Sequence, residues 1–127
     1  MNDPVRLDQF REVARFDPGR LEELCREKGE VQAESEAAMA LGEIGEILRD
    51  LTPADHGLHD AVVARRIDRL ADAADRIGMS TLARVAADVR SCIDCGDVVA
   101  YAATLARLYR VGDRSIHAIF DLDDQIV

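Results

Sequence analysis

Residues 63–77 have the sequence VARRIDRLADAADRI, in which apolar residues recur at alternating intervals of four and three. These apolar residues are Val63, Ile67, Leu70, Ala74 and Ile77. The spacing places them on one face of an α-helix and most of the charged residues on the other, as in a helix packed within a bundle. The stretch therefore predicts an amphipathic helix that is buried along one side.

Capping residues predict helix boundaries on both sides of this stretch. In chain order the boundaries are Asp3-Pro4, Asp17-Pro18, Gly29, Thr52-Pro53, Gly78, Ser80 and Gly96-Asp97. They divide the chain into a short first helix, a second ending near Gly29, a third over residues 31–51, a fourth that starts at Thr52-Pro53 and contains residues 63–77, a fifth from Ser80 and a long last helix.

Three glycines lie inside the predicted helices. Gly42 and Gly45 either weaken their helix by about 1 kcal/mol each relative to alanine or let another helix approach closely. Gly112 marks a weak point in the last helix.

Short connections between long helices favour antiparallel neighbours. The expected fold is all-α: an up-and-down antiparallel four-helix bundle with one or two short N-terminal helices. We expect residues 1–127 to form one domain, since a chain of this length can bury a core without disulfides or metal.

Charge and composition exclude several classes of function. The net charge of −9 disfavours nucleic acid and anionic membranes as partners. No apolar run approaches the roughly 20 residues of a membrane span, and the first ten residues, MNDPVRLDQF, do not resemble a signal peptide. Three cysteines do not suggest a disulfide framework. We therefore expect a cytoplasmic location.

The order of these signals resembles the histidine phosphotransfer (HPt) domain of bacterial phosphorelays, over nearly the whole chain. Residues 16–21 (FDPGRL) resemble that family's opening helix, and residues 67–82 (IDRLADAADRIGMSTL) resemble its phosphorylation helix and the turn that follows. Residues 86–98, with Gly96-Asp97, resemble the next helix and the usual start of the last. The resemblance implies a partner that is a response-regulator receiver domain or a histidine kinase.

The chain departs from the family at the residues that carry the chemistry. With Ile77-Gly78 as the anchor, Asp68 stands at the position of the phosphate-accepting histidine, Ala71 at that of the lysine and Asp72 at that of the glycine. Phosphotransfer needs a neutral imidazole nitrogen as nucleophile and a positive charge near the phosphoryl oxygens. We therefore expect a non-catalytic interaction module with no enzymatic activity, no cofactor and no metal.

The expected interaction face is formed by charged residues on the same helix: Arg65, Asp68, Arg69, Asp72, Asp75 and Arg76. Its three aspartates should repel the acidic active site of a receiver unless the arginines or a divalent cation intervene. The alternative is an ordinary solvated helix face. A magnesium site at Asp68 and Asp72 is disfavoured, because two exposed carboxylates bind the ion weakly.

Other readings of the sequence stay open. His59 or Asp68 would be the acceptor in an atypical phosphotransfer protein, although His59 is followed by Val62 and Val63 where lysine and glycine would be needed. Cys92 and Cys95 form a C-x-x-C pair that is best explained as small buried hydrophobic residues. Residues 116–127 are apolar with acidic positions, so a helical homodimer unrelated to signalling is the third alternative.

Overall fold

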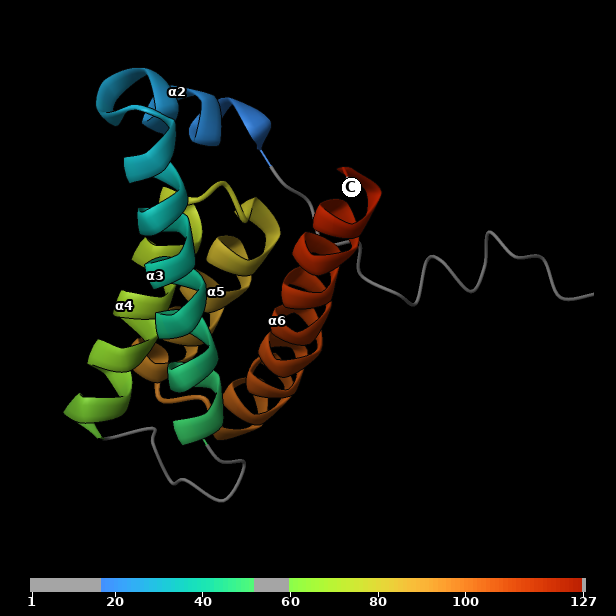
Figure 1. The fold of residues 1–127 in the computed structure, drawn as a ribbon. Coiled ribbons are helices and arrows are strands. Elements are labelled where there is room, and N and C mark those ends of the chain that lie inside the picture. The colour runs from blue at the N-terminus through green and yellow to red at the C-terminus, as the bar shows by residue number, and fades with distance from the viewer. Residues whose placement is uncertain (1–16, 52–59, 127) are drawn as a thin grey trace, which may run out of the picture.

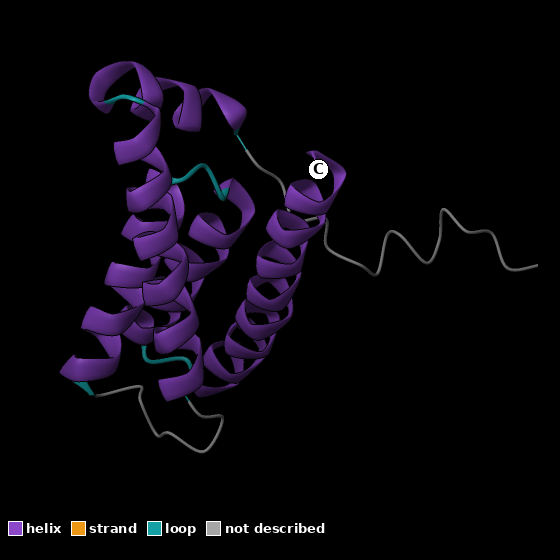
Figure 2. Cartoon of the chain, viewed as in Figure 1, coloured by secondary structure: helices purple, strands orange, loops and turns teal. Residues whose placement is uncertain are grey.

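The computed structural model describes residues 17–51 and 60–126, with side chains up to His117, and all regular structure in these ranges is helical (Figure 2). The prediction of an all-α fold is therefore confirmed. The helices are α2 (Pro18–Lys28), α3 (Glu30–Asp50), α4 (Ala61–Arg76), α5 (Ser80–Cys95) and α6 (Val98–Ile126). The helix predicted after Asp3-Pro4 and the boundary at Thr52-Pro53 lie outside the described residues.

The four long helices α3, α4, α5 and α6 pack side by side, and successive ones run in opposite directions (Figure 1). Each packs against the next in chain order, and α3 also contacts α6. The short helix α2 lies across one end and packs against α3. No helix in the described ranges is long and apolar enough to cross a membrane.

Most of the predicted helix ends are confirmed by their hydrogen bonds. The Asp17 carboxylate accepts a hydrogen bond from the Gly19 amide (3.0 Å), and Pro18 is the first residue of α2. Gly29 ends α2 with a φ of 85°. Gly96 ends α5 in the left-handed conformation, and the Asp97 carboxylate accepts from the Ala100 amide (3.0 Å) at the start of α6.

The turn between α4 and α5 is a Schellman motif centred on Gly78. The Met79 amide donates to the Ala74 carbonyl (2.8 Å), and the Gly78 amide donates to the Asp75 carbonyl (3.1 Å). Gly78 has a φ of 80°, and a Cβ there would collide with the Asp17 carbonyl. The Gly78 carbonyl in turn accepts from the Asp17 amide (2.6 Å), which ties the start of α2 to this turn.

Two boundaries differ from the predictions. Ser80 is the first residue of α5 rather than its cap, and the N-cap residue is Met79, which makes no side-chain cap. α4 begins at Ala61, where the Asp60 carboxylate accepts from the Val62 amide (2.8 Å). Asp60 is extended, so no helix runs unbroken from Thr52-Pro53 into α4. Thr52-Pro53 and Asp60 are both residues typical of a helix start. The spacing of the apolar residues does not show which of the two begins α4.

The core is mainly aliphatic, with Tyr101 also buried in it, and is shared by α3, α4, α5 and α6. All five apolar residues predicted for residues 63–77 are buried, with exposed fractions of 3% or less. The other large, fully buried side chains of the core are Ile44, Leu51, Met79, Leu82, Val85, Val89, Leu108 and Val111. The period of four and three residues therefore identified the inner face of α4.

The interior glycines behave differently from one another. A Cβ on Gly42 or Gly45 would have no heavy atom within 4 Å, so no described helix makes use of the missing side chain. A Cβ on Gly112 would lie 2.6 Å from Leu48 Cδ1, so this glycine lets α3 approach α6. Gly112 is thus a packing position inside a continuous helix and not a weak point.

Candidate functional site

The candidate site is the outer face of α4, opposite its buried stripe. The six charged residues predicted for this face are all exposed, and Asp68 lies near the middle of the helix. Ala71 is half-buried and packs against the core. The structure therefore places Asp68 at a solvent-facing position, with 55% of its side chain exposed.

Asp68 forms an ion pair with Arg90 of α5. Arg90 Nε lies 3.2 Å from Asp68 Oδ1 and donates to Oδ2 at 3.3 Å, while Arg90 Nη1 pairs with Asp94 one turn further along α5. Hydrogen bonds to Asp94 and then to Asp68 raise the pKa of Arg90. Asp68 thus faces a permanently charged guanidinium, which contacts both of its carboxylate oxygens.

Arg69 lies on the opposite flank and joins α4 to α3. Its Nε and Nη2 both donate to Glu43 Oε1, at 3.1 and 2.9 Å. The two neighbouring residues Asp68 and Arg69 therefore point to different helices, the aspartate towards α5 and the arginine towards α3.

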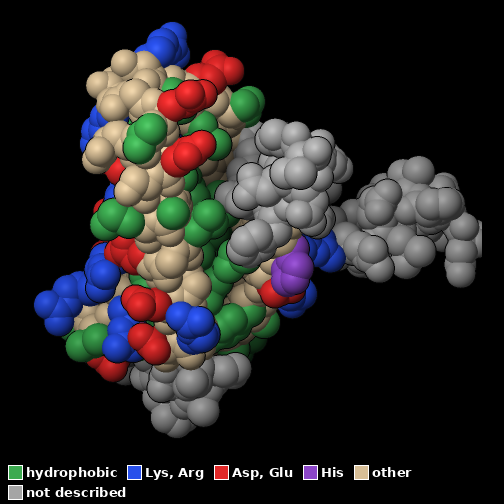
Figure 3. Space-filling model, viewed as in Figure 1, with side chains coloured by type: hydrophobic (Ala, Val, Ile, Leu, Met, Phe, Trp, Pro, Cys, Tyr) green, Lys and Arg blue, Asp and Glu red, His purple; other side chains and the backbone are tan. Residues whose placement is uncertain are grey.

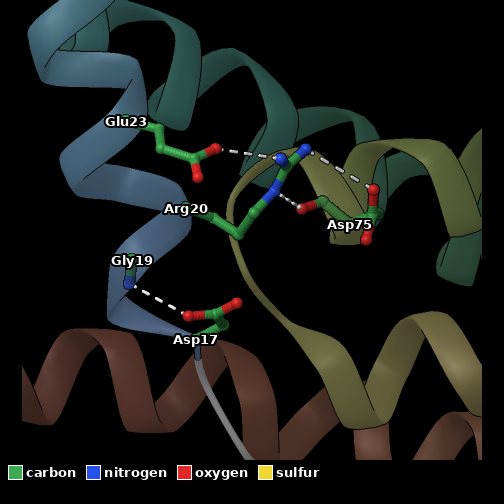
Figure 4. A network of polar contacts seen from close by, with 5 residues as sticks. All are labelled: Asp17, Gly19, Arg20, Glu23 and Asp75. Atoms are coloured by element: carbon green, nitrogen blue, oxygen red, sulfur yellow. Dashed lines mark hydrogen bonds and ion pairs between the residues drawn. The ribbon is translucent and has the colours of Figure 1, made fainter.

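Asp75 joins the end of α4 to α2 (Figure 4). Arg20 Nη2 lies 3.6 Å from Asp75 Oδ2, Arg20 Nε donates to the Asp75 backbone carbonyl at 3.4 Å, and Nη1 donates to Glu23 at 3.2 Å. Arg20 follows the Asp17 cap by three residues and lies in the first turn of α2.

The other three charges of the face, Arg65, Asp72 and Arg76, form no ion pair with another described residue. The acidic stripe predicted from the sequence is therefore not three equivalent free carboxylates. Two of them are occupied by arginines from neighbouring helices, and the unpaired charges comprise two cations and one anion.

Among the described residues, the lysine and the histidine that phosphotransfer would require lie on other helices than Asp68. The sequence contains a single lysine, Lys28, which lies on α2 and pairs with Glu36 at 2.6 Å. His117 is an exposed residue of α6, with Nδ1 2.7 Å from the Asp113 carbonyl oxygen. His56 and His59 lie outside the described residues, and both precede the first residue of α4.

The cysteines do not gather into a site. Cys92 is half-buried with Thr104 Oγ1 3.7 Å from its sulfur, Cys95 is exposed, and Cys25 is half-buried on α2. The interpretation of Cys95 as a buried hydrophobic residue is therefore wrong. Within the described ranges, no three His, Cys, Asp or Glu side chains are grouped so as to hold a metal ion.

Sequence reasoning missed Arg90, Arg20 and Glu43, the partners of the α4 charges. Arg90 and Asp94 do have the i, i+4 spacing of an ion pair on one helix. The contacts between helices depend on how α4 is rotated against its neighbours, which the spacing within one helix does not specify. Comparison of the chain with protein-family models, with curated proteins and with solved structures found no match.

Proposed function

We propose that this protein is an HPt-like four-helix bundle that binds a receiver domain or a histidine kinase through the outer face of α4 and does not accept phosphate. The proposal rests on one observation: Asp68 occupies the exposed middle of α4 and is ion-paired with Arg90. An anion already held by a guanidinium is poorly suited to attack phosphorus. Binding without transfer would let the protein compete with an active phosphotransfer protein in the cytoplasm.

The charges of α4 suit an acidic partner surface such as the active site of a receiver. Asp68 and Asp75 are neutralised by Arg90 and Arg20. Among the described residues, Arg65, Arg76 and Asp72 have no ion-pair partner, so this face has two unpaired cations and one unpaired anion. The electrostatic repulsion expected from three aspartates is therefore largely offset, and the two arginines can contact carboxylates of the partner.

The test is binding and phosphotransfer with receiver domains and histidine kinases encoded in the same genome. We expect at least one of them to bind the full chain, and we expect no label to move onto the chain from a phosphorylated receiver. Arg65→Glu should weaken binding by about tenfold, because it places a carboxylate opposite the acidic partner. Arg110→Glu is the matched control, since Arg110 is exposed on α6 with no ion pair to a described residue, and should leave affinity unchanged.

Three outcomes would contradict the proposal. Label on the chain that disappears in His59→Gln or Asp68→Asn would show an atypical phosphotransfer protein. If Arg65→Glu and Arg110→Glu reduce the affinity for the partner equally, α4 is excluded as the binding face. If no receiver or kinase binds and the chain sediments as a dimer, the homodimer unrelated to signalling would be favoured.

A further inference from the structure

The outer face of α3 exposes apolar side chains that no described helix covers. Val31 is 83% exposed and Met39 is 71% exposed. Ser35, Ala38 and Gly42 are also exposed and lie on the same side, at helical spacing. Figure 3 shows this part of α3 as backbone and uncharged groups with separate hydrophobic side chains, and with acidic side chains beside it. The opposite side of α3 is the buried one, carrying Ala33, Ala40, Ile44 and Ile47.

The composition of this face is not explained by packing against any other described part of the chain. Gly42 and Gly45 each cost a helix about 1 kcal/mol relative to alanine. A Cβ at either position would meet no heavy atom within 4 Å, and neither residue has a positive φ. A face of large exposed apolar residues separated by small ones allows another helix to pack closely against it, with its side chains between Val31 and Met39.

The carboxylates of α3 separate into two groups by their partners. Glu36 and Glu43 face neighbouring helices and are paired with Lys28 and Arg69. The exposed carboxylates nearer the outer face form no ion pair with a described residue; they are Glu30, Glu34, Glu46 and Asp50. Their negative charge is therefore free to attract a cationic partner.

From these observations we propose that the outer face of α3 binds an amphipathic helix of another protein, one with an apolar stripe and Lys or Arg on both flanks. A second copy of this chain is the less suitable occupant. The exposed part of α3 carries four carboxylates that are unpaired among the described residues and one basic residue, Arg49, so two copies of this face would repel each other. This surface is separate from the outer face of α4 and does not rest on the function proposed for that face.

The test uses synthetic helical peptides of about 18 residues, or five turns. One peptide has a Leu and Ala stripe flanked by Lys. The second has the same composition with the helical period scrambled, and the third has Glu in place of Lys. We expect the first to bind the full chain, the scrambled peptide to bind at least about tenfold more weakly, and the Glu peptide not to bind. Raising the salt concentration should weaken binding of the first peptide.

Variants of the protein then locate the site. Met39→Glu should reduce affinity for the Lys peptide by about tenfold or more, because it places a charge in the apolar stripe. Val99→Glu is the matched control: Val99 is 80% exposed on α6, so the variant makes the same change in charge away from α3. It should keep the affinity of the natural sequence.

Several results would overturn the inference. If the scrambled peptide binds as tightly as the Lys peptide, the attraction is due to charge alone. If Met39→Glu binds the Lys peptide as tightly as the natural sequence does, the outer face of α3 is excluded as the site. A concentration-dependent dimer in sedimentation that Met39→Glu abolishes would show that a second copy is the occupant. Met39→Glu should leave receiver or kinase binding unchanged, and Arg65→Glu should leave peptide binding unchanged, so the two proposals can fail separately.

Discussion

The side chain of Leu48 fills the space beside Gly112, whereas the space beside Gly42 is empty. Gly42→Ala should therefore raise the free energy of unfolding by about 1 kcal/mol, the gain in helix propensity. Gly112→Ala should lower it by about 1 kcal/mol, because repacking Leu48 costs roughly 1–3 kcal/mol and exceeds that gain. Urea unfolding followed by circular dichroism measures both. Changes of the same sign in the two variants would contradict this account of α3 and α6.

Ion pairs on the surface connect each helix to its neighbours. The pairs between helices are Lys28–Glu36, Arg20–Asp75, Glu43–Arg69, Asp68–Arg90 and Asp88–Arg107. They are partly exposed, so salt and water screen them and each contributes little to stability. Their main structural effect is to orient charges: Asp68 is drawn towards α5, Asp75 towards α2 and Arg69 towards α3.

The Glu43–Arg69 pair can be measured with a double-mutant cycle. Glu43→Gln and Arg69→Gln should each reduce stability slightly, with a coupling of about 0.5 kcal/mol that shrinks as salt is added. Glu43→Gln combined with Arg110→Gln is the control and should give no coupling, since Arg110 has no ion pair with a described residue. A coupling well above 1 kcal/mol would mean that the pair is shielded from solvent more than its exposure indicates.

The helix boundaries that the sequence predicts correctly depend on the residues at the boundaries themselves. Pro18, Gly29, Gly78 and Gly96 fix helix ends through their own backbone preferences, and these boundaries are correct. The exposure of Asp68 also follows from the period of its own helix. Its partner Arg90 does not, because that contact depends on how two helices pack. The ion-pair pattern of the candidate site therefore required the structure.

The whole molecule combines a mainly aliphatic core with an uneven distribution of charge. The residues of α3 contain six acids and one base, whereas those of α4 contain four arginines and three aspartates. Much of the net charge of −9 is therefore concentrated on one helix, and α4 is slightly basic. An acidic partner and a basic partner would be attracted to different sides of the same protein.

The hydrogen bond from the Asp17 amide to the Gly78 carbonyl connects two segments that are distant in the chain. Neither segment can detach without breaking that bond, and the Arg20–Asp75 contacts lie beside it. Hydrogen–deuterium exchange of the backbone amides should therefore show that α2 and the last turn of α4 open together, as one cooperative unit. Mass spectrometry of the peptides would detect this, and earlier labelling of α2 alone would show that the two segments open independently.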